Sequence, residues 1–352
     1  MINILHSADW HLDSPMQLYN EEASHQMRRK LQQIPERIAA LCKAKHCDLV
    51  LLSGDLFDGP YTADSLRHLK SALEEMAVPV FITPGNHDFV GSSSPWQTQV
   101  FPSNVHVFAR QSIEYKDIEE LDCRVYGAGF ITMDCPGLLA GFCADSPMKY
   151  NIGIFHGDPT QVNSPYCPIT SEQVENSGLD YLALGHIHKS GSFRAGKTLC
   201  AWPGCPMGTG YDEQGDKGVL LTSLDDTAEA AFIPLGMPRF FDLEINPGEL
   251  SNVLPPMGNE DFYRITLVGD SEPIDVATLK AQYSQFPNLV LRDRTVPPVD
   301  VWCSADDDTF EGIYFNLLRK SLENADEKTQ RQIQLAAKIS RQLLDGQEVT
   351  LP

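Results

Sequence analysis

Seven side chains that can bind a divalent metal ion lie at or just beyond the ends of short apolar runs. Carboxylate, carbonyl oxygen and imidazole groups are the ligands that hard and borderline divalent ions prefer. The candidates are Asp9, His11, Asp55, Asn86, His156, His186 and His188. Two metal ions about 3.5–4 Å apart can be bridged by one carboxylate. The residue types therefore predict a site for a pair of divalent ions.

The elements that must position these ligands are predicted to be buried strands. The run Val80–Ile82 stops at Pro84 and Gly85 and is followed at once by Asn86, His87 and Asp88. Apolar runs bounded by proline and glycine are typical of buried strands, and open α/β sheets bind ligands at the carboxyl edge of their strands. Similar runs, at residues 2–6, 48–53 and 181–184, precede the other Asp and His pairs.

Spacing gives a further expectation for two of these pairs. His186 and His188 are two residues apart, as are Asp9 and His11. Because side chains alternate along a strand, residues two apart share one face of it. We therefore expect each pair to present both side chains on the same face of an extended strand.

Each motif alone also has a purely structural explanation. A lone Gly-Asp or Asp-x-His is usually a turn or a satisfied core pair, and a His-x-His pair alone is ordinary. Several such motifs in order, each after an apolar run, favour the metal site. The histidines without this context are expected to be structural or surface residues, namely His6, His25, His46, His68 and His106.

The pattern along the chain predicts an α/β fold with three regions. Strand and helix patterns alternate first and β-rich sequence follows, which favours two packed sheets with helices outside. A helical pattern over residues 21–45 is interrupted by Pro35, and Thr62 can cap the next helix. The expected regions are an α/β domain at 1–237, a small α+β domain at 238–300 and a helical segment at 301–352.

Composition and charge limit the classes of function. The chain has 352 residues, nine cysteines without a Cys-x-x-Cys pair, no long uncharged apolar stretch and no basic-then-apolar amino terminus. These features predict a soluble cytoplasmic protein without membrane contact or disulfide framework. The net charge of −21 argues against tight, independent nucleic-acid binding. It does not exclude phosphate chemistry at a metal site, where the bound ions are the largest local charges.

Taken together, the motifs resemble those of the calcineurin-like metallophosphoesterases, over roughly residues 1–235. The matching pieces are Asp9-Trp10-His11, Gly54-Asp55-Leu56-Phe57-Asp58, Gly85-Asn86-His87-Asp88, His156-Gly157 and Gly185-His186-Ile187-His188. The Leu-Phe-Asp and Leu-Gly-His-Ile-His-Lys runs, and the stretch from Trp202 to Gly218 that includes Glu213, are similar to DNA repair exonucleases of the SbcD and YhaO type. The resemblance implies a four-layer αββα sandwich with a small α+β cap and a C-terminal helical segment.

The same resemblance implies a role for each site residue. One metal ion would take Asp9, His11, Asp55 and His188, and the other Asp55, Asn86, His156 and His186, with Asp55 bridging. His87 would be the general acid that protonates the leaving oxygen, and Asp58 would orient it. Manganese is expected first, while iron, magnesium and zinc remain open.

Three functions remain open at this stage. The first is a metal-dependent phosphodiesterase that acts as a DNA exonuclease or endonuclease subunit in DNA repair. The second is a small-molecule phosphodiesterase, for example on cyclic nucleotides. A protein phosphatase is disfavoured because Gly59 stands where that class carries an arginine. The third is an interaction subunit that is active only with an ATPase partner.

The resemblance also implies protein partners. Helices after the cap would dock on a coiled-coil ATPase of the SbcC type. A homodimer through helices of the phosphoesterase half is compatible with the resemblance, although no residue pattern in the chain indicates it. A stripe of Phe310, Ile313, Tyr314, Leu317 and Leu318 fits a helix that lies in a partner's groove. The same stripe equally fits packing on its own domain.

Overall fold

The computed structural model describes residues 1–352 except 17, 19–20, 299, 324, 347–348 and 350–352. The chain divides into two compact units. The first comprises Met1–Asp242, Asn259–Arg264 and Phe286–Asn288, and the second comprises Leu243–Gly258, Ile265–Gln285 and Leu289–Pro352. The domain limits expected at 237 and 300 remain predictions.

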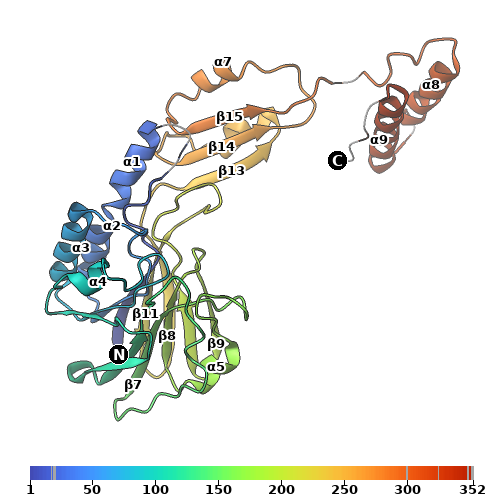
Figure 1. Cartoon of the computed structure of the whole chain (residues 1–352). Coiled ribbons are helices and arrows are strands. Elements are labelled where there is room, and N and C mark those ends of the chain that lie inside the picture. Colours follow the sequence, from blue (N-terminus) through green and yellow to red (C-terminus); the bar gives the residue numbers. More distant parts are fainter. Residues whose placement is uncertain (17, 19–20, 299, 324, 347–348, 350–352) are drawn as a thin grey trace. The chain divides into compact units, whose positions relative to one another are not determined.

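Two six-stranded sheets form the framework of the first unit (Figure 1). In the first sheet the order is β12 (Ala228–Pro234), β11 (Gly218–Leu224), β1 (Ile2–Ser7), β2 (Leu49–Leu52), β3 (Val80–Ile82) and β4 (Val105–Val107). In the second it is β5 (Glu114–Ile118), β6 (Cys123–Ala128), β7 (Tyr150–His156), β8 (Tyr181–Gly185), β10 (Thr198–Trp202) and β9 (Gly191–Ala195). Strands β1 to β4 are parallel, as are β6, β7 and β8, so their carboxyl ends lie at one edge of each sheet.

The two sheets pack face to face with helices outside, which confirms the predicted αββα layers. Along β1, Leu5 packs with Met27 of α1 (Glu21–Leu31) and Ile38 of α2 (Ile34–Ala44), and α3 (Ala63–Met76) joins the same cluster. Ile4, which precedes Leu5 in β1, faces the opposite side of the sheet and packs with Ile152 of β7. On the outer face of the second sheet, α5 (Ser171–Asn176) contributes to a third cluster. The short helices η1 (Glu119–Leu121) and α4 (Pro95–Thr98) lie in the connections.

Local signals in the helical layer act as the sequence predicts. Pro35 separates α1 from α2 and occupies the first turn of α2, where its missing N–H removes no helical hydrogen bond. Thr62 caps α3 by accepting a hydrogen bond from the backbone N–H of Ser65 at 3.1 Å.

Beyond β12 the chain forms a smaller α+β region and a helical pair. The small sheet has the order β13 (Phe240–Ile245), β14 (Phe262–Leu267), β15 (Leu289–Asp293), accompanied by η2 (Pro247–Glu249), α6 (Leu250–Val253) and α7 (Val276–Ala281). Helices α8 (Phe310–Leu322) and α9 (Glu327–Leu344) follow and share a small core around Phe315. Within the part of the chain that the structure describes, no helix is long and apolar enough to cross a lipid bilayer.

The predicted stripe on α8 divides between two environments. Tyr314 and Leu318 pack against the Phe315 core, and the Tyr314 hydroxyl lies 2.8 Å from the Ser340 hydroxyl of α9. Phe310, Ile313 and Leu317 instead expose 89%, 56% and 62% of their surface. The stripe therefore holds the helix pair together on one side and leaves an apolar ridge on the other.

Candidate metal centre

The chain turns sharply after β1, β2 and β8, and the turning residues are predicted ligands. The φ angles of Asp9, His11 and Asp55 are 54°, 49° and 51°, and that of His186 is 95°. Such angles cost about 1–3 kcal/mol for non-glycine residues and collect at functional sites. The expectation that each two-residue pair shares a face of an extended strand is wrong, because β1 ends at Ser7 and β8 at Gly185. The directions of the Asp9, His11, Asp55 and His186 side chains are therefore set by left-handed turns and not by the alternation of side chains along a strand.

Backbone hydrogen bonds hold these turns together. The N–H groups of Asp9 and His11 donate to the carbonyls of Gly54 and Asp55, each at 3.0 Å. The carboxylate of Asp9 accepts from the backbone N–H of His186 at 3.0 Å. That of Asp55 accepts from the backbone N–H of His87 at 2.8 Å. Each buried carboxylate is thus held in place by the turn of another strand.

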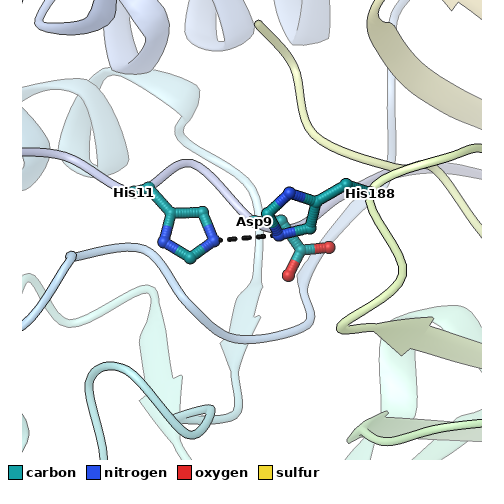
Figure 2. A group of neighbouring side chains, drawn as sticks. All are labelled: Asp9, His11 and His188. Atoms are coloured by element: carbon teal, nitrogen blue, oxygen red, sulfur yellow. Dashed lines mark hydrogen bonds between the residues drawn. The ribbon is translucent and has the colours of Figure 1, made fainter. Parts of the chain in front are cut away.

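The first cluster joins the ends of β1 and β8 (Figure 2). Ligand atoms of Asp9, His11 and His188 lie within 4.8 Å of one another. The Nε2 atoms of His11 and His188 face each other at 3.1 Å. Three side chains from opposite sheets therefore converge on one point. That they bind the first metal ion together with Asp55 remains a prediction.

The donor set of this cluster fits a cation. The Nδ1 of His188 contacts the Glu213 carboxylate and the Nδ1 of His11 lies 3.4 Å from an oxygen of Asp58, so both Nδ1 atoms are placed as hydrogen donors. In a neutral imidazole the other nitrogen then carries a lone pair. Two lone pairs and the Asp9 carboxylate consequently point at one another. A divalent ion between them would satisfy all three.

A second cluster joins the ends of β2, β3 and β7. The Nε2 of His156 lies 3.3 Å from Oδ2 of Asp55 and 2.9 Å from Oδ1 of Asn86. Its Nδ1 donates to the Ser53 carbonyl at 2.9 Å, which again leaves Nε2 for a cation. Burial would lower the pKa of His156, but the negative charges of Asp55 and Asp9 outweigh it and raise the pKa to about 9. Nε2 therefore faces the two oxygen atoms that would share a metal ion with it.

His186 lies beside this second cluster. Its ring centroid is 5.3 Å from that of His156 and 4.8 Å from that of Tyr166. Among the described residues, its nitrogens belong to none of the groups of His, Cys, Asp or Glu whose ligand atoms lie within 4.8 Å. The structure thus brings six of the seven predicted ligands into close contact and places His186 next to them. Its role as a ligand remains a prediction.

Buried negative charge supports the same conclusion. Asp9 and Asp55 expose only 1% and 2% of their surface. Burial raises the pKa of Asp9, because the charged form is poorly solvated there. In the described part of the chain, the ion-pair partners of these two carboxylates are histidines, with no lysine or arginine among them. The cluster therefore lacks a permanent positive charge, which bound metal ions would supply.

His87 and Asp58 form a pair at the edge of the centre. The Nδ1 of His87 lies 2.8 Å from Oδ1 of Asp58, and the side chain of His87 is 47% exposed. The hydrogen bond to Asp58 raises the pKa of His87. The ring of His87 contacts that of His11 edge-on, at 4.8 Å between centroids. His87 is thus positioned beside the predicted ligands and half exposed, and within the described part of the chain its ring hydrogen-bonds through Nδ1 alone.

Glu213 is a site residue to which the sequence assigned no role. It accepts a hydrogen bond from Nδ1 of His188, and also bonds from the Thr209 N–H at 2.6 Å and hydroxyl at 2.9 Å. Although burial opposes ionisation, these contacts lower the pKa of Glu213 to about 2. Lys217 donates to the His188 carbonyl at 3.1 Å from the same loop. The only signal in the sequence was the position of Glu213 within the glycine-rich stretch after β10.

We expect Glu213→Gln to weaken Mn²⁺ binding by about 10- to 100-fold, since carboxylates that orient a ligating histidine tune metal affinity by that amount. Glutamine has nearly the same shape but loses the charge that fixes the Nδ1–H tautomer of His188. Isothermal titration with Mn²⁺ measures the change. Glu229→Gln, at an exposed position of β12, is the matched control. A Mn²⁺ affinity of Glu213→Gln within twofold of the wild type would show that Glu213 does not support metal binding.

More than half of the chain is similar to known proteins. Residues 2–190 match the family model of the calcineurin-like phosphoesterases. Over 242 residues the chain is 31% identical to the uncharacterized metallophosphoesterase YhaO of Bacillus subtilis (strain 168), a match that covers 62% of this chain and 57% of that protein. This chain therefore spans little more than half the length of that relative.

Solved structures give more distant similarities. The protein TT1561 of Thermus thermophilus matches with a TM-score of 0.39 and 13% identity, over 66% of this chain and 98% of that one. A dimetal phosphatase from Danio rerio matches with a TM-score of 0.41 and 12% identity, over 63% of this chain and 92% of that one.

Proposed function

The chain belongs to the calcineurin-like phosphoesterase family, and we propose that within this family it is a phosphodiesterase whose substrate is DNA. Membership makes it a metal-dependent phosphoester hydrolase with a site for two metal ions. The observation that carries the finer proposal is His87 beside the two clusters, bound to Asp58 at 2.8 Å. The alkoxide that leaves a nucleic-acid backbone is strongly basic, so its departure needs a proton donor at this place.

The site residues have two separate roles in the proposed reaction, which are metal binding and proton donation. Asp9, His11, Asp55 and His188 would hold one ion, and Asp55, Asn86, His156 and His186 the other. When bound, such ions act as Lewis acids toward the phosphoryl oxygens and lower the pKa of a water molecule. Asp58 holds the ring of His87 through Nδ1, which leaves Nε2 to donate a proton to the leaving oxygen.

Manganese is the metal that we propose. The proposal rests on the resemblance to nucleases that favour this ion, and the carboxylate and amide oxygens of the ligand set suit it. Iron and zinc accept the same donors. Reconstitution of the metal-free protein with each of the four ions, followed by activity assays, decides among them.

The proposed substrate is tested on linear DNA with Mn²⁺, with His87→Ala as the control. We expect cleavage by the wild type and a loss of about 10²- to 10⁴-fold in the variant. Cleavage unaffected by His87→Ala would reject the assigned chemistry.

A small-molecule phosphodiesterase is the second candidate, and the net charge of −21 favours it. An acidic surface repels a polyanion but affects a cyclic nucleotide far less. Hydrolysis of cyclic nucleotides or bis-p-nitrophenyl phosphate, with no action on DNA, would select it.

The exposed ridge of α8 supports a partner proposal. Phe310, Ile313 and Leu317 are spaced three and four residues apart, which is the pattern of a helix that lies in an apolar groove. We propose that they dock on a coiled-coil ATPase, which would also contribute to DNA binding. Copurification from the native host should yield the ATPase with the wild type and lose it when all three are changed to serine. The control is the double variant Lys328→Ser and Arg331→Ser in α9, which should retain the ATPase. Retention of the ATPase by the triple variant would contradict the proposal.

A further inference from the structure

A pocket of about 450 Å³ opens directly beside His87. Small-molecule sites have volumes of about 300–1,000 Å³. The pocket is lined by His87 together with Tyr61, Phe89 and Ser93, and also by Gly59, Pro60, Asp88, Gly91, Ser94 and Pro95. None of these ten residues is a metal ligand in the proposed centre. The pocket is therefore a neighbour of the centre and not part of it.

The two aromatic walls are fixed by packing. The ring centroids of Tyr61 and Phe57 lie 5.5 Å apart. Phe57 belongs to the core between the first sheet and its helices, and Tyr61 packs against that core. Phe89 packs instead against the cluster on the outer face of the second sheet. Both side chains remain partly exposed toward the pocket. Each ring thus reaches the pocket from a rigid part of the fold, which limits the entropy lost when a ligand binds.

Two polar side chains of the lining are satisfied within the protein. The Asp88 carboxylate accepts from the N–H groups of Gly85 and Leu56 at 2.7 and 2.9 Å. The Ser94 hydroxyl accepts from the N–H of Trp96 at 3.2 Å, where it caps α4. Among the residues that the structure describes, no lysine or arginine lines the pocket. These walls suit an uncharged planar group, and the described lining has no lysine or arginine that could pair with a second phosphate.

From this arrangement we propose that the pocket binds the base of the leaving nucleoside, stacked on Tyr61 and Phe89. The inference rests on the proposed function, because it takes His87 as the general acid. In the hydrolysis, the attacking water loses a proton to the solvent and its oxygen forms a bond to phosphorus, while the bond from phosphorus to the nucleoside oxygen breaks. That oxygen takes the proton from His87, so the nucleoside that carries it must lie on the His87 side. The pocket opens on that side.

The test uses dinucleoside monophosphates from which one base has been removed. With Mn²⁺, the wild type should hydrolyse the intact diadenosine compound at least about fivefold faster, in kcat/KM, than the analogue whose leaving nucleoside lacks its base. Removal of the other base should have less than a twofold effect. Tyr61→Leu and Phe89→Leu should each reduce the preference for the intact compound to less than about twofold. Two separate variants, each checked by circular dichroism, guard against one that fails to fold.

A binding measurement separates this inference from the proposed function. The fluorescence of 2-aminopurine riboside should be quenched by the wild type equally with Mn²⁺ and after EDTA treatment, and not by Tyr61→Leu or Phe89→Leu. Hydrolysis without any base preference and without quenching would overturn the pocket and leave the phosphodiesterase intact. Quenching without hydrolysis of any diester would instead overturn the proposed function.

Discussion

Replacing Asp55 with asparagine is expected to lower kcat/KM for phosphodiester hydrolysis by at least about 10³-fold, equivalent to about 4 kcal/mol. Oδ2 of Asp55 lies 3.3 Å from Nε2 of His156 and 3.9 Å from Nε2 of His11, so one oxygen faces both clusters. The asparagine side chain removes the charge that would bridge two cations and can turn an N–H₂ group toward them. Steady-state assays on bis-p-nitrophenyl phosphate measure the loss.

The structure also indicates why this variant should fold. Oδ1 of Asp55 accepts from the His87 N–H at 2.8 Å, and an asparagine oxygen can do the same. A Cβ at Gly85 would lie 2.2 Å from Oδ1 of Asp55, so the fold depends on the shape of this side chain. Asp226→Asn, at an exposed position of the turn between β11 and β12, controls for a charge change. Activity within tenfold of the wild type in Asp55→Asn would contradict the bridging role.

His87→Ala should reduce kcat by about 10²- to 10⁴-fold for a dinucleoside monophosphate and by less than about tenfold for bis-p-nitrophenyl phosphate. The p-nitrophenolate leaves as a stable anion, whereas a nucleoside alkoxide needs the proton. Mn²⁺ affinity should stay within twofold, because His87 lies at the exposed edge and forms its hydrogen bond with Asp58, outside the predicted ligand set. Steady-state kinetics on each of the two substrates measure the two losses in kcat, and a Mn²⁺ titration measures the affinity.

The comparison between substrates makes this prediction specific. A general structural disturbance would lower both rates together. Equal losses on both substrates, or loss of the metal ions, would show that His87 supports the centre and does not donate a proton.

The framework of this site could be predicted because each ligand follows a strand that the sequence marks clearly. The run that ends at Ile82 and the turn at Pro84 and Gly85 are local signals, and so are the cap at Thr62 and the break at Pro35. Parallel strands bring their carboxyl ends to one edge, so separate motifs can be expected to meet. The αββα layers follow from the same alternation.

Other features depend on tertiary contacts that a sequence does not reveal. Strand β11 pairs antiparallel with β1 across more than 200 residues of chain, with Ile2 opposite Leu224. The left-handed turn at His186 is held by the hydrogen bond from its N–H to Asp9, whereas the spacing of the two histidines alone predicts an extended strand. Glu213 contacts His188 only because the loop after β10 folds back on it. In each case a long-range contact overrides the local pattern.

The central claim is that loop ends from both sheets hold two metal ions around Asp55. Metal content measured by inductively coupled plasma mass spectrometry tests it most directly, on the full chain loaded with Mn²⁺ and freed of unbound ions by gel filtration. We predict about two ions per wild-type chain and at most about one in Asp55→Asn. A wild-type chain that retains no metal, or one that hydrolyses phosphodiesters at full rate after EDTA has removed it, would contradict the account.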